Sequence, residues 1–287
     1  MGVIPDRELD HELDHLQDGE LAVVVGRLRA AGCVFAEDEA ALIAESARSA
    51  AELAAMVDRR VAGEPLEYVV GWASFRGLRI AVDPGVFVPR RRTEFLVSEA
   101  MRVTVAGAVV LDLCCGAGAL GAAVAAERDV TLYAADIEPA AIRCARRNLA
   151  PYGGSVFEGD LFAPLPADLR GRVDVLLANV PYVPTDEIRL LPAEARLHEP
   201  HVTLDGGADG LAVLRRVAAG ASKWLTPGGH LFVEASDRQV PSALRVMESA
   251  GLSAEVVSDD DLGANVVHGV RSGARPGAGR GAGTRGD

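Results

Sequence analysis

Apolar residues recur in two alternating patterns over the larger, C-terminal part of the chain. Short and nearly continuous apolar runs are followed by longer stretches with helical spacing, which predicts strands alternating with helices. This alternation is typical of an α/β domain with a mostly parallel sheet. The predicted strands are 109–115, 130–136, 155–159, 173–178, 229–235, 254–257 and 265–271. The predicted helices are 118–127, 138–149, 208–225 and 239–250, and the domain that they complete extends over residues 99–271.

The chain before residue 99 follows other patterns. Residues 20–75 are rich in Ala and Leu and predict a small helical domain, with helices at 21–31, 36–49 and 51–61. Residues 76–98 carry alternating apolar residues on both sides of Asp83-Pro84-Gly85, which predicts a β-hairpin linker that turns at these residues. Residues 1–19 form an acidic leader with the spacing of a short amphipathic helix, and the Gly/Ala/Arg-rich tail at 272–287 has the composition of a disordered segment.

A glycine-rich stretch follows the first strand of the predicted α/β domain. Gly116, Gly118 and Gly121 allow the backbone to approach a ligand, and the helix after them offers unpaired N–H groups. The next strand closes with Asp136, which is placed to accept hydrogen bonds from a ribose. The stretch therefore predicts a nucleotide-type cofactor, and its spacing fits NAD(P) and S-adenosylmethionine equally well.

Two further features favour S-adenosylmethionine. Asp112 lies inside the first strand, where a carboxylate can face a cationic cofactor group but would repel a pyrophosphate. The predicted strand 173–178 runs into Asn179-Val180-Pro181-Tyr182. This second sequence suits amide or amine chemistry and has no obvious role in hydride transfer.

The composition argues against nucleic acid and membranes as partners. The formal net charge of −12 opposes nonspecific binding to a phosphate backbone. No apolar run approaches the roughly 20 residues that span a bilayer, and the acidic N-terminus is unlike a signal peptide. We therefore expect a cytoplasmic protein that does not associate with membranes.

No metal site is predicted. The segment His11-Glu12-Leu13-Asp14-His15 matches the zinc-protease pattern H-E-x-x-H, but it lies in the charged leader. A zinc site of that kind needs a third ligand beside a cleft. The four cysteines show no C-x-x-C spacing, so we interpret them as small core residues in a reducing compartment.

These motifs, taken in order, resemble the HemK-type protein-(glutamine-N5) methyltransferases, which methylate the glutamine of the Gly-Gly-Gln motif in peptide-chain release factors. The resemblance covers about residues 20–270. It implies a class I S-adenosylmethionine-dependent methyltransferase fold with a Rossmann-like seven-stranded sheet, a small N-terminal helical domain and a hairpin linker. The matching residues are Gly63-Glu64-Pro65, Tyr68, Gly71, 85–90, Thr93-Glu94, Asp112-Leu113, Gly116, Gly118, Asp136, Asn148, Asp160, Asn179, Pro181-Tyr182, Glu199-Pro200, 205–207 and 209–211.

The resemblance also implies a role for each residue of the site. The side-chain oxygen of Asn179 and the main-chain carbonyl of Val180 would accept the two N–H groups of the acceptor amide. Pro181 would supply a rigid turn and Tyr182 an aromatic wall. In the cofactor site, Asp136 would bind the ribose and Asp160 the adenine amino group, while Gly116, Gly118, Asp112 and Asn179 would surround the methionine portion. A monomer that acts on a protein substrate, such as a release factor, is implied.

Three departures from the family pattern leave the acceptor open. Val180 stands where the family has Pro, Arg91 and Arg92 replace Pro and Glu, and the C-terminal pattern is only partly kept at 261–266. We expect activity to survive at Val180, because the accepting carbonyl is main-chain and Pro181 favours an extended Val180 in any case. Glu199 and Pro200 follow the Asn motif in a segment that is as consistent with an exposed loop as with substrate contact, so they are not assigned to the catalytic set.

Other acceptors and one inactive alternative are also consistent with the sequence. The same Asn-x-Pro-Tyr chemistry serves the exocyclic amine of adenine, although a flipped-base enzyme needs a basic face. A small-molecule or peptide amide or amine would fit the altered motif. A module that binds the cofactor without turnover is a further alternative. The sequence therefore predicts the reaction class and not the identity of the acceptor.

Overall fold

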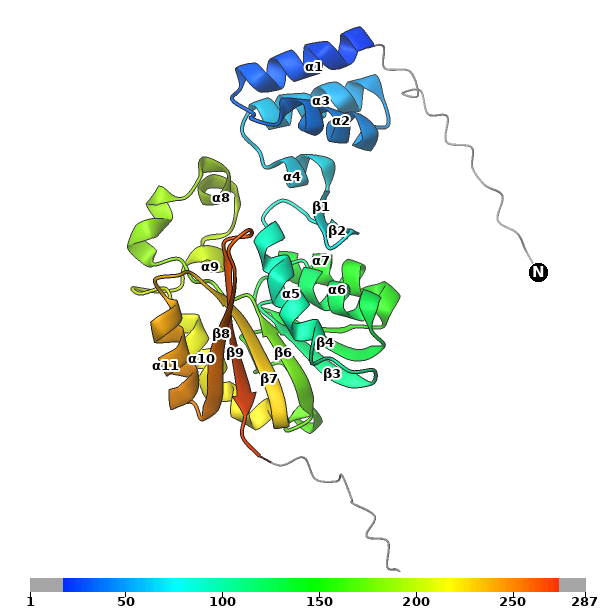
Figure 1. The fold of residues 1–287 in the computed structure, drawn as a ribbon. Coiled ribbons are helices and arrows are strands. Elements are labelled where there is room, and N and C mark those ends of the chain that lie inside the picture. The colour runs from blue at the N-terminus through cyan, green and yellow to red at the C-terminus, as the bar shows by residue number, and fades with distance from the viewer. Residues whose placement is uncertain (1–17, 274–287) are drawn as a thin grey trace, which may run out of the picture. The chain divides into compact units, whose positions relative to one another are not determined.

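The computed structural model describes residues 18–273, and these form two compact units. One unit contains the chain through Trp72 together with Pro192–His198, and the other contains Ala73–Leu191 and the chain from Glu199 onward. Figure 1 shows the elements of both units. The predicted leader helix, the H-E-x-x-H segment and the tail from residue 274 lie outside the described residues.

The first unit is built from short helices. Its core is formed by apolar side chains such as Leu28, Ile43 and Val57, which are almost completely buried. The second helix ends earlier than predicted because Ala47 is extended and Ser49 caps the third helix, accepting a hydrogen bond from the Glu52 N–H at 3.2 Å. The helices are α1 (Asp18–Ala30), α2 (Ala36–Ser46), α3 (Ala50–Val61), α4 (Leu66–Val70) and, within the returning segment, α8 (Ala193–His198).

A β-hairpin forms at the start of the predicted linker, but not around the predicted turn. The paired strands are β1 (Trp72–Phe75) and β2 (Leu78–Ala81). The turn between them is Arg76-Gly77, where both residues have positive φ, as a tight two-residue hairpin turn requires. A turn also exists from Asp83 to Val86, but the segments on its two sides do not pair as strands.

The second unit contains a seven-stranded sheet in the order β5-β4-β3-β6-β7-β9-β8. The pairs from β5 through β7 are parallel, and β9 pairs antiparallel with both β7 and β8. This arrangement confirms the predicted α/β fold with a mostly parallel sheet. The strands are β3 (Ala108–Leu113), β4 (Val130–Asp136), β5 (Ser155–Glu158), β6 (Val173–Ala178), β7 (Leu225–Ala235), β8 (Leu252–Asp259) and β9 (Ala264–Arg271).

Helices cover both faces of this sheet, as Figure 1 shows. On one face α5 contacts α6 and α6 contacts α7, and on the other α10 contacts α11. The α-helices are α5 (Glu94–Met101), α6 (Ala119–Glu127), α7 (Pro139–Leu149), α9 (His201–Leu204), α10 (Ala212–Trp224) and α11 (Val240–Ser249). The short 3₁₀ helices are η1 (Arg91–Thr93), η2 (Ala150–Tyr152), η3 (Ala167–Leu169) and η4 (Thr185–Leu190).

The central strands form the core of the second unit. Side chains such as Leu111, Leu176 and Leu231 are fully buried, because helices pack on both sides of them. Helix α10 begins later than predicted, since the preceding Gly207 and Gly210 both have positive φ and shape a turn. None of the helices formed by residues 18–273 is long and apolar enough to cross a membrane.

Candidate active site

The predicted site residues meet at the carboxyl ends of three adjacent strands. Leu113 at the end of β3 pairs with Ala135 on β4 and with Ala178 on β6, so the residues that follow these strands lie at one edge of the sheet. The chain also reverses its direction of winding here, because β4 and β5 lie on one side of β3 while β6 and β7 lie on the other. Ligands of open α/β sheets bind at such a switch point.

Asp136 holds the glycine-rich loop in place. One of its carboxylate oxygens accepts the Gly116 N–H at 2.8 Å, and the other accepts the Glu138 N–H at 2.9 Å. The carboxyl group is mostly buried, and burial raises its pKa. Each oxygen keeps a second lone pair, so the carboxylate can still accept hydrogen bonds from a ligand.

Gly118 has two reasons to be glycine. Its φ of +80° lies in the left-handed region, and a Cβ there would approach Leu149 to 3.1 Å and Ala145 to 3.3 Å. Both neighbours belong to α7, so the loop lies directly against that helix. The sequence pattern predicted close approach to a ligand, and the structure adds close approach to a helix.

Asp112 is the most deeply buried carboxyl group of the site, with 1% of its surface exposed. One oxygen accepts the Gly121 N–H at 2.9 Å, which fixes the first turn of α6. The other oxygen, Oδ1, has no hydrogen-bond partner among the described residues. Burial raises the pKa of Asp112 to about 8, with the Asp136 carboxylate adding a smaller effect in the same direction.

Asp160 lies two residues beyond β5 and is half-exposed. Its carboxylate forms an ion pair with Arg216 at 2.5 Å. Arg216 belongs to α10, which packs on the face of the sheet away from α6. The sequence did not indicate this ion pair.

Asn179 directly follows β6. Its side-chain oxygen is buried and has no hydrogen-bond partner among the described residues. Buried polar atoms are nearly always hydrogen-bonded, so an unpaired amide oxygen at the edge of the sheet is a feature to be explained by a ligand. Val180 is almost completely buried and packs into the core of the second unit. This packing fixes the position of the segment Asn179–Tyr182.

Tyr182 is held at both ends. Its main-chain carbonyl accepts a hydrogen bond from Gln239 Nε2 at 2.8 Å, and its hydroxyl donates to Glu234 Oε1 at 3.0 Å. The Arg92 guanidinium donates to the same hydroxyl. Gly210 packs so tightly against the Tyr182 carbonyl and Gln239 that no larger residue would fit.

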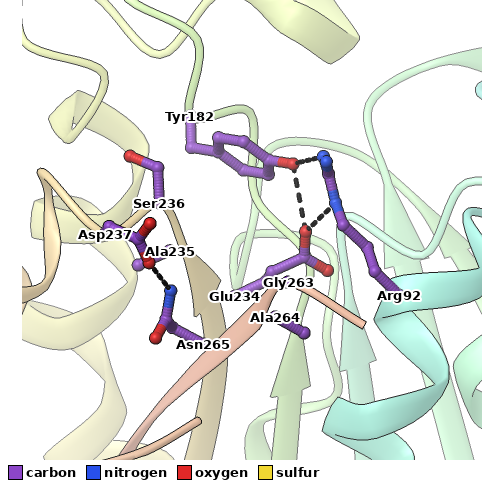
Figure 2. A pocket seen from close by; sticks show the side chains of 9 residues that line it. All are labelled: Arg92, Tyr182, Glu234, Ala235, Ser236, Asp237, Gly263, Ala264 and Asn265. Atoms are coloured by element: carbon purple, nitrogen blue, oxygen red, sulfur yellow. Dashed lines mark hydrogen bonds and ion pairs between the residues drawn. The ribbon is translucent and has the colours of Figure 1, made fainter. Parts of the chain in front are cut away.

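A pocket of about 130 Å³ opens beside Tyr182 and Glu234. Figure 2 shows Arg92, Tyr182 and Glu234 on one side of it and the residues from Ala235 to Asp237 with Asn265 on the other. Gly263 and Ala264, at the turn between β8 and β9, complete the lining. The pocket thus adjoins the last residue of the Asn motif.

Sequence reasoning missed several residues that build the site. Glu199, which was as consistent with an exposed loop, is 6% exposed and accepts hydrogen bonds from the Val88 N–H at 3.2 Å and the Arg90 guanidinium at 2.5 Å. Glu234 was also missed. The available signal was an acid that nearly closes an apolar strand, as Asp136 does.

The linker is fastened to the site by α7. Asn148 accepts the Ala81 N–H at 2.9 Å and donates to the carbonyls of Ala81 and Ala117 at 2.9 and 2.8 Å. Arg147 pairs with Asp83 at 2.7 Å. The hairpin, the helix and the glycine-rich loop are therefore connected through one side chain, Asn148.

Comparison with known proteins identifies the family. A family model described as the methyltransferase small domain matches residues 77–207. A release factor glutamine methyltransferase from Geobacter sulfurreducens is 38% identical over 228 residues, which cover 77% of this chain and 79% of that protein. The chain belongs to the release factor glutamine methyltransferase family.

A second family member is similarly close in sequence, and a solved structure shares the fold. The release factor glutamine methyltransferase of Streptomyces coelicolor is 39% identical over 189 residues, covering 64% of this chain and 67% of that protein. The crystal structure of a methyltransferase from Pyrococcus furiosus shares the fold, with a TM-score of 0.51, 16% identity and coverage of 68% of this chain and 90% of that one.

Family membership confirms the predicted class I methyltransferase fold and enzyme class. The glycine spacing fits two classes of cofactor equally well. Membership of a methyltransferase family favours S-adenosylmethionine over NAD(P). Among residues 18–273, no group of three or more His, Cys, Asp or Glu side chains is arranged to hold a metal ion.

Proposed function

We propose that this chain transfers a methyl group from S-adenosylmethionine to the side-chain amide nitrogen of a glutamine in a peptide-chain release factor. The observation that carries the proposal is the buried Asn179 Oδ1, which has no hydrogen-bond partner within residues 18–273. An accepting oxygen at this position suits an amide N–H donor. The names of the curated relatives support the same acceptor.

The residues at the strand ends fit this cofactor. Asp112 Oδ1 is a buried oxygen with no hydrogen-bond partner among the described residues, and a cationic group beside it would stabilise the ionised carboxylate. Asp136 retains lone pairs for ribose hydroxyls. Gly116 and Gly118 allow the main chain to approach the methionine portion. When bound, the cofactor supplies an electrophilic methyl group on a positively charged sulfur.

Asp160 is the proposed partner of the adenine amino group. Its exposed carboxylate follows β5, the strand next to the one that ends in Asp136. The ion pair with Arg216 occupies one of the carboxylate oxygens, and the other keeps its accepting capacity. An amino group is a hydrogen-bond donor, so this assignment is chemically consistent.

Asn179 and Val180 orient the acceptor. An amide nitrogen is a poor nucleophile because its lone pair is delocalised into the carbonyl, so catalysis depends on holding it in line with the methyl group. Asn179 Oδ1 accepts one N–H and the Val180 carbonyl accepts the other, which fixes the direction of the nitrogen. After transfer, the N-methyl amide loses its extra proton to water.

Pro181 and Tyr182 complete the acceptor site. Pro181 restricts the motif and keeps Val180 in the extended region, so the presence of Val in this position preserves the accepting carbonyl. Tyr182 supplies a flat wall for the amide. We further propose that the enzyme acts as a monomer on a protein substrate in the cytoplasm, where peptide release takes place.

The test is transfer of labelled methyl from S-adenosylmethionine to purified release factors, with lysate from a strain lacking this protein assayed in parallel. Mass spectrometry of the products locates the label. We expect it on the glutamine of Gly-Gly-Gln. Label on a nucleic acid or small molecule, with none on release factors, would contradict the proposed acceptor.

A further inference from the structure

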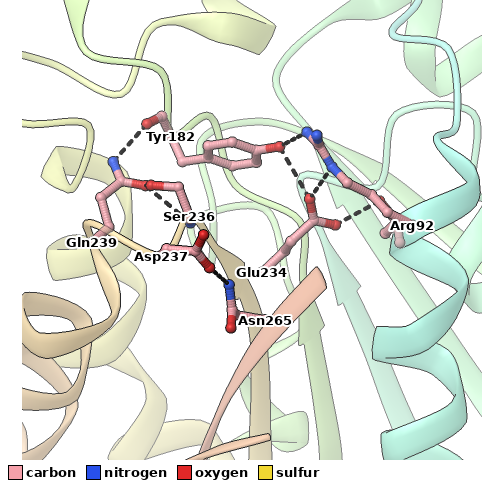
Figure 3. A network of polar contacts seen from close by, with 8 residues as sticks. Arg92, Tyr182, Glu234, Ser236, Asp237, Gln239 and Asn265 are labelled. Atoms are coloured by element: carbon pink, nitrogen blue, oxygen red, sulfur yellow. Dashed lines mark hydrogen bonds and ion pairs between the residues drawn. The ribbon is translucent and has the colours of Figure 1, made fainter. Parts of the chain in front are cut away.

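A charged cluster outside the residues assigned above meets the hydroxyl of Tyr182. Glu234 lies near the end of β7, Arg92 and Thr93 lie in η1, and Tyr182 follows β6. Arg92 Nε donates to Glu234 Oε1 at 2.8 Å, and Thr93 Oγ1 donates to Glu234 Oε2 at 2.6 Å. Figure 3 shows this cluster with the Gln239 contact at the opposite end of Tyr182.

Arg92 compensates a buried charge. The Glu234 side chain is only 5% exposed, and an uncompensated carboxylate in such a place is strongly unfavourable. The other charged residue of the pocket lining, Asp237, is an acid and adds no compensation. Arg92 is the one cationic side chain among the residues that line the pocket.

Arg92 also determines where the Tyr182 hydroxyl lies. The hydroxyl accepts from Arg92 and donates to Glu234, so both hydrogen-bonding directions of the phenol are used. Burial, and then the Glu234 carboxylate, raise the pKa of Tyr182, so the phenol stays protonated and keeps donating. With Gln239 holding its carbonyl, Tyr182 has little freedom to move.

We propose that Arg92 is a positioning residue of the acceptor site, which neutralises Glu234 and fixes the Tyr182 ring beside the acceptor amide. The proposal rests on the proposed function, because the acceptor amide is what the ring positions. Three segments of the second unit, η1, the Asn motif and β7, meet in this one cluster.

The first experiment compares Arg92→Gln with Arg91→Gln. Arg91 is the neighbouring residue in η1 and is exposed, and its side chain makes no hydrogen bond or ion pair with the described residues, so it serves as the matched control. We expect Arg92→Gln to lower kcat/KM for the release factor by about 10- to 100-fold, since small misplacements of an acceptor are costly. The dissociation constant of S-adenosylmethionine should stay unchanged in both variants.

Two further variants separate positioning from folding. Arg92→Lys keeps the positive charge, but an ammonium group cannot reproduce the planar guanidinium that donates to both Glu234 and Tyr182. We therefore expect a kcat/KM between those of the wild type and Arg92→Gln. Arg92→Gln combined with Glu234→Gln replaces the ion pair by two uncharged amides and should recover part of the loss. If Arg92→Gln lowers stability while kcat/KM stays at the wild-type value, the role is purely structural and the proposal is wrong.

A spectroscopic readout keeps this proposal separate from the identity of the acceptor. The chain has four tyrosines, so the ¹⁹F resonance of Tyr182 in fluorotyrosine-labelled protein can be assigned with a Tyr182→Phe variant. We expect Arg92→Gln to shift or broaden this resonance, and Arg91→Gln to leave it in place. Absence of transfer to release factors would overturn the proposed function alone, whereas an unchanged resonance in Arg92→Gln would overturn the role of Arg92.

Discussion

Asn179 and Asp112 present the same chemical feature at the residue scale. Each has a buried side-chain oxygen that lacks a partner within the described residues, and each lies in or directly after a central strand. Leaving a buried polar atom unpaired costs about 1–3 kcal/mol. Such a cost is explained if the atom is reserved for a ligand, and the two oxygens then mark the acceptor and cofactor parts of one site.

Replacing Asn179 by Ala tests the acceptor part. The variant loses the oxygen that we propose orients the amide, so methyl transfer should fall by orders of magnitude while S-adenosylmethionine binding persists. Single-turnover transfer and calorimetric cofactor titration measure the two effects. Unchanged turnover would show that the amide is oriented by other groups.

Replacing Asp112 by Asn tests the buried carboxyl group through the pH dependence of stability. Its pKa is about 8 in the folded protein and about 3.9 in an unfolded chain, so the folded state holds an extra proton between these values. The stabilisation is fully present below the unfolded pKa and is lost as the pH rises through 8.

We therefore expect the free energy of unfolding of the wild type to fall between about pH 4 and 8 more steeply than that of Asp112→Asn. Urea unfolding at several pH values measures the slopes. Equal slopes would mean that Asp112 is already ionised at low pH in the folded protein.

Among the elements, α7 joins the hairpin to the glycine-rich loop. Its residues contact the hairpin through Asn148 and the following turn through Arg147 and Cys144, whose sulfur accepts the Asp83 N–H at 3.3 Å. The same helix supports Gly118. The linker is thus attached to the helix that supports the glycine-rich loop.

Asn148→Ala removes three hydrogen bonds at this junction. At about 0.5–1.5 kcal/mol each, the loss of stability should be roughly 1.5–4.5 kcal/mol, and cofactor affinity should fall because the loop loses its support at Ala117. Denaturant unfolding and cofactor titration provide the measurements. Arg146→Ala, on an exposed face of the same helix, is the control and should change neither quantity.

At the scale of the whole molecule, the chain returns to its first unit after the Asn motif. Pro192–His198 belongs with the N-terminal helices, where Glu194 pairs with Arg60 at 2.6 Å. Arg60 is buried and also pairs with Glu39 at 2.6 Å. The returning segment Pro192–His198 is therefore held to the N-terminal helices by an ion-pair network within the helical unit.

Arg60→Met should be strongly destabilising. It leaves the Glu39 carboxylate buried without its partner, for which a loss of about 3–5 kcal/mol is typical. Glu194→Gln removes only the half-exposed partner and should cost about 1 kcal/mol or less. Chemical unfolding of both variants gives the comparison, and similar losses would refute this ranking of the two pairs.

Much of the fold could be predicted because it depends on local rules. Helices and strands follow from apolar periodicity, and the glycine-rich loop follows from positions such as Gly118 that need a positive φ. The hairpin was misplaced by the same reasoning. Asp83-Pro84-Gly85 is the stronger turn sequence, while the Arg76-Gly77 turn forms where the flanking strands actually pair.

Local residue patterns were therefore enough to predict the fold class, the family and the strands that carry Asp112, Asp136 and Asn179. Which side chains meet at the ends of these strands follows from the three-dimensional arrangement of the elements. Arg92 lies 142 residues from Glu234 and Glu199 lies 109 residues from Arg90. Contacts over such separations depend on the order of strands in the sheet, which brings distant segments together and which no local pattern of residues encodes.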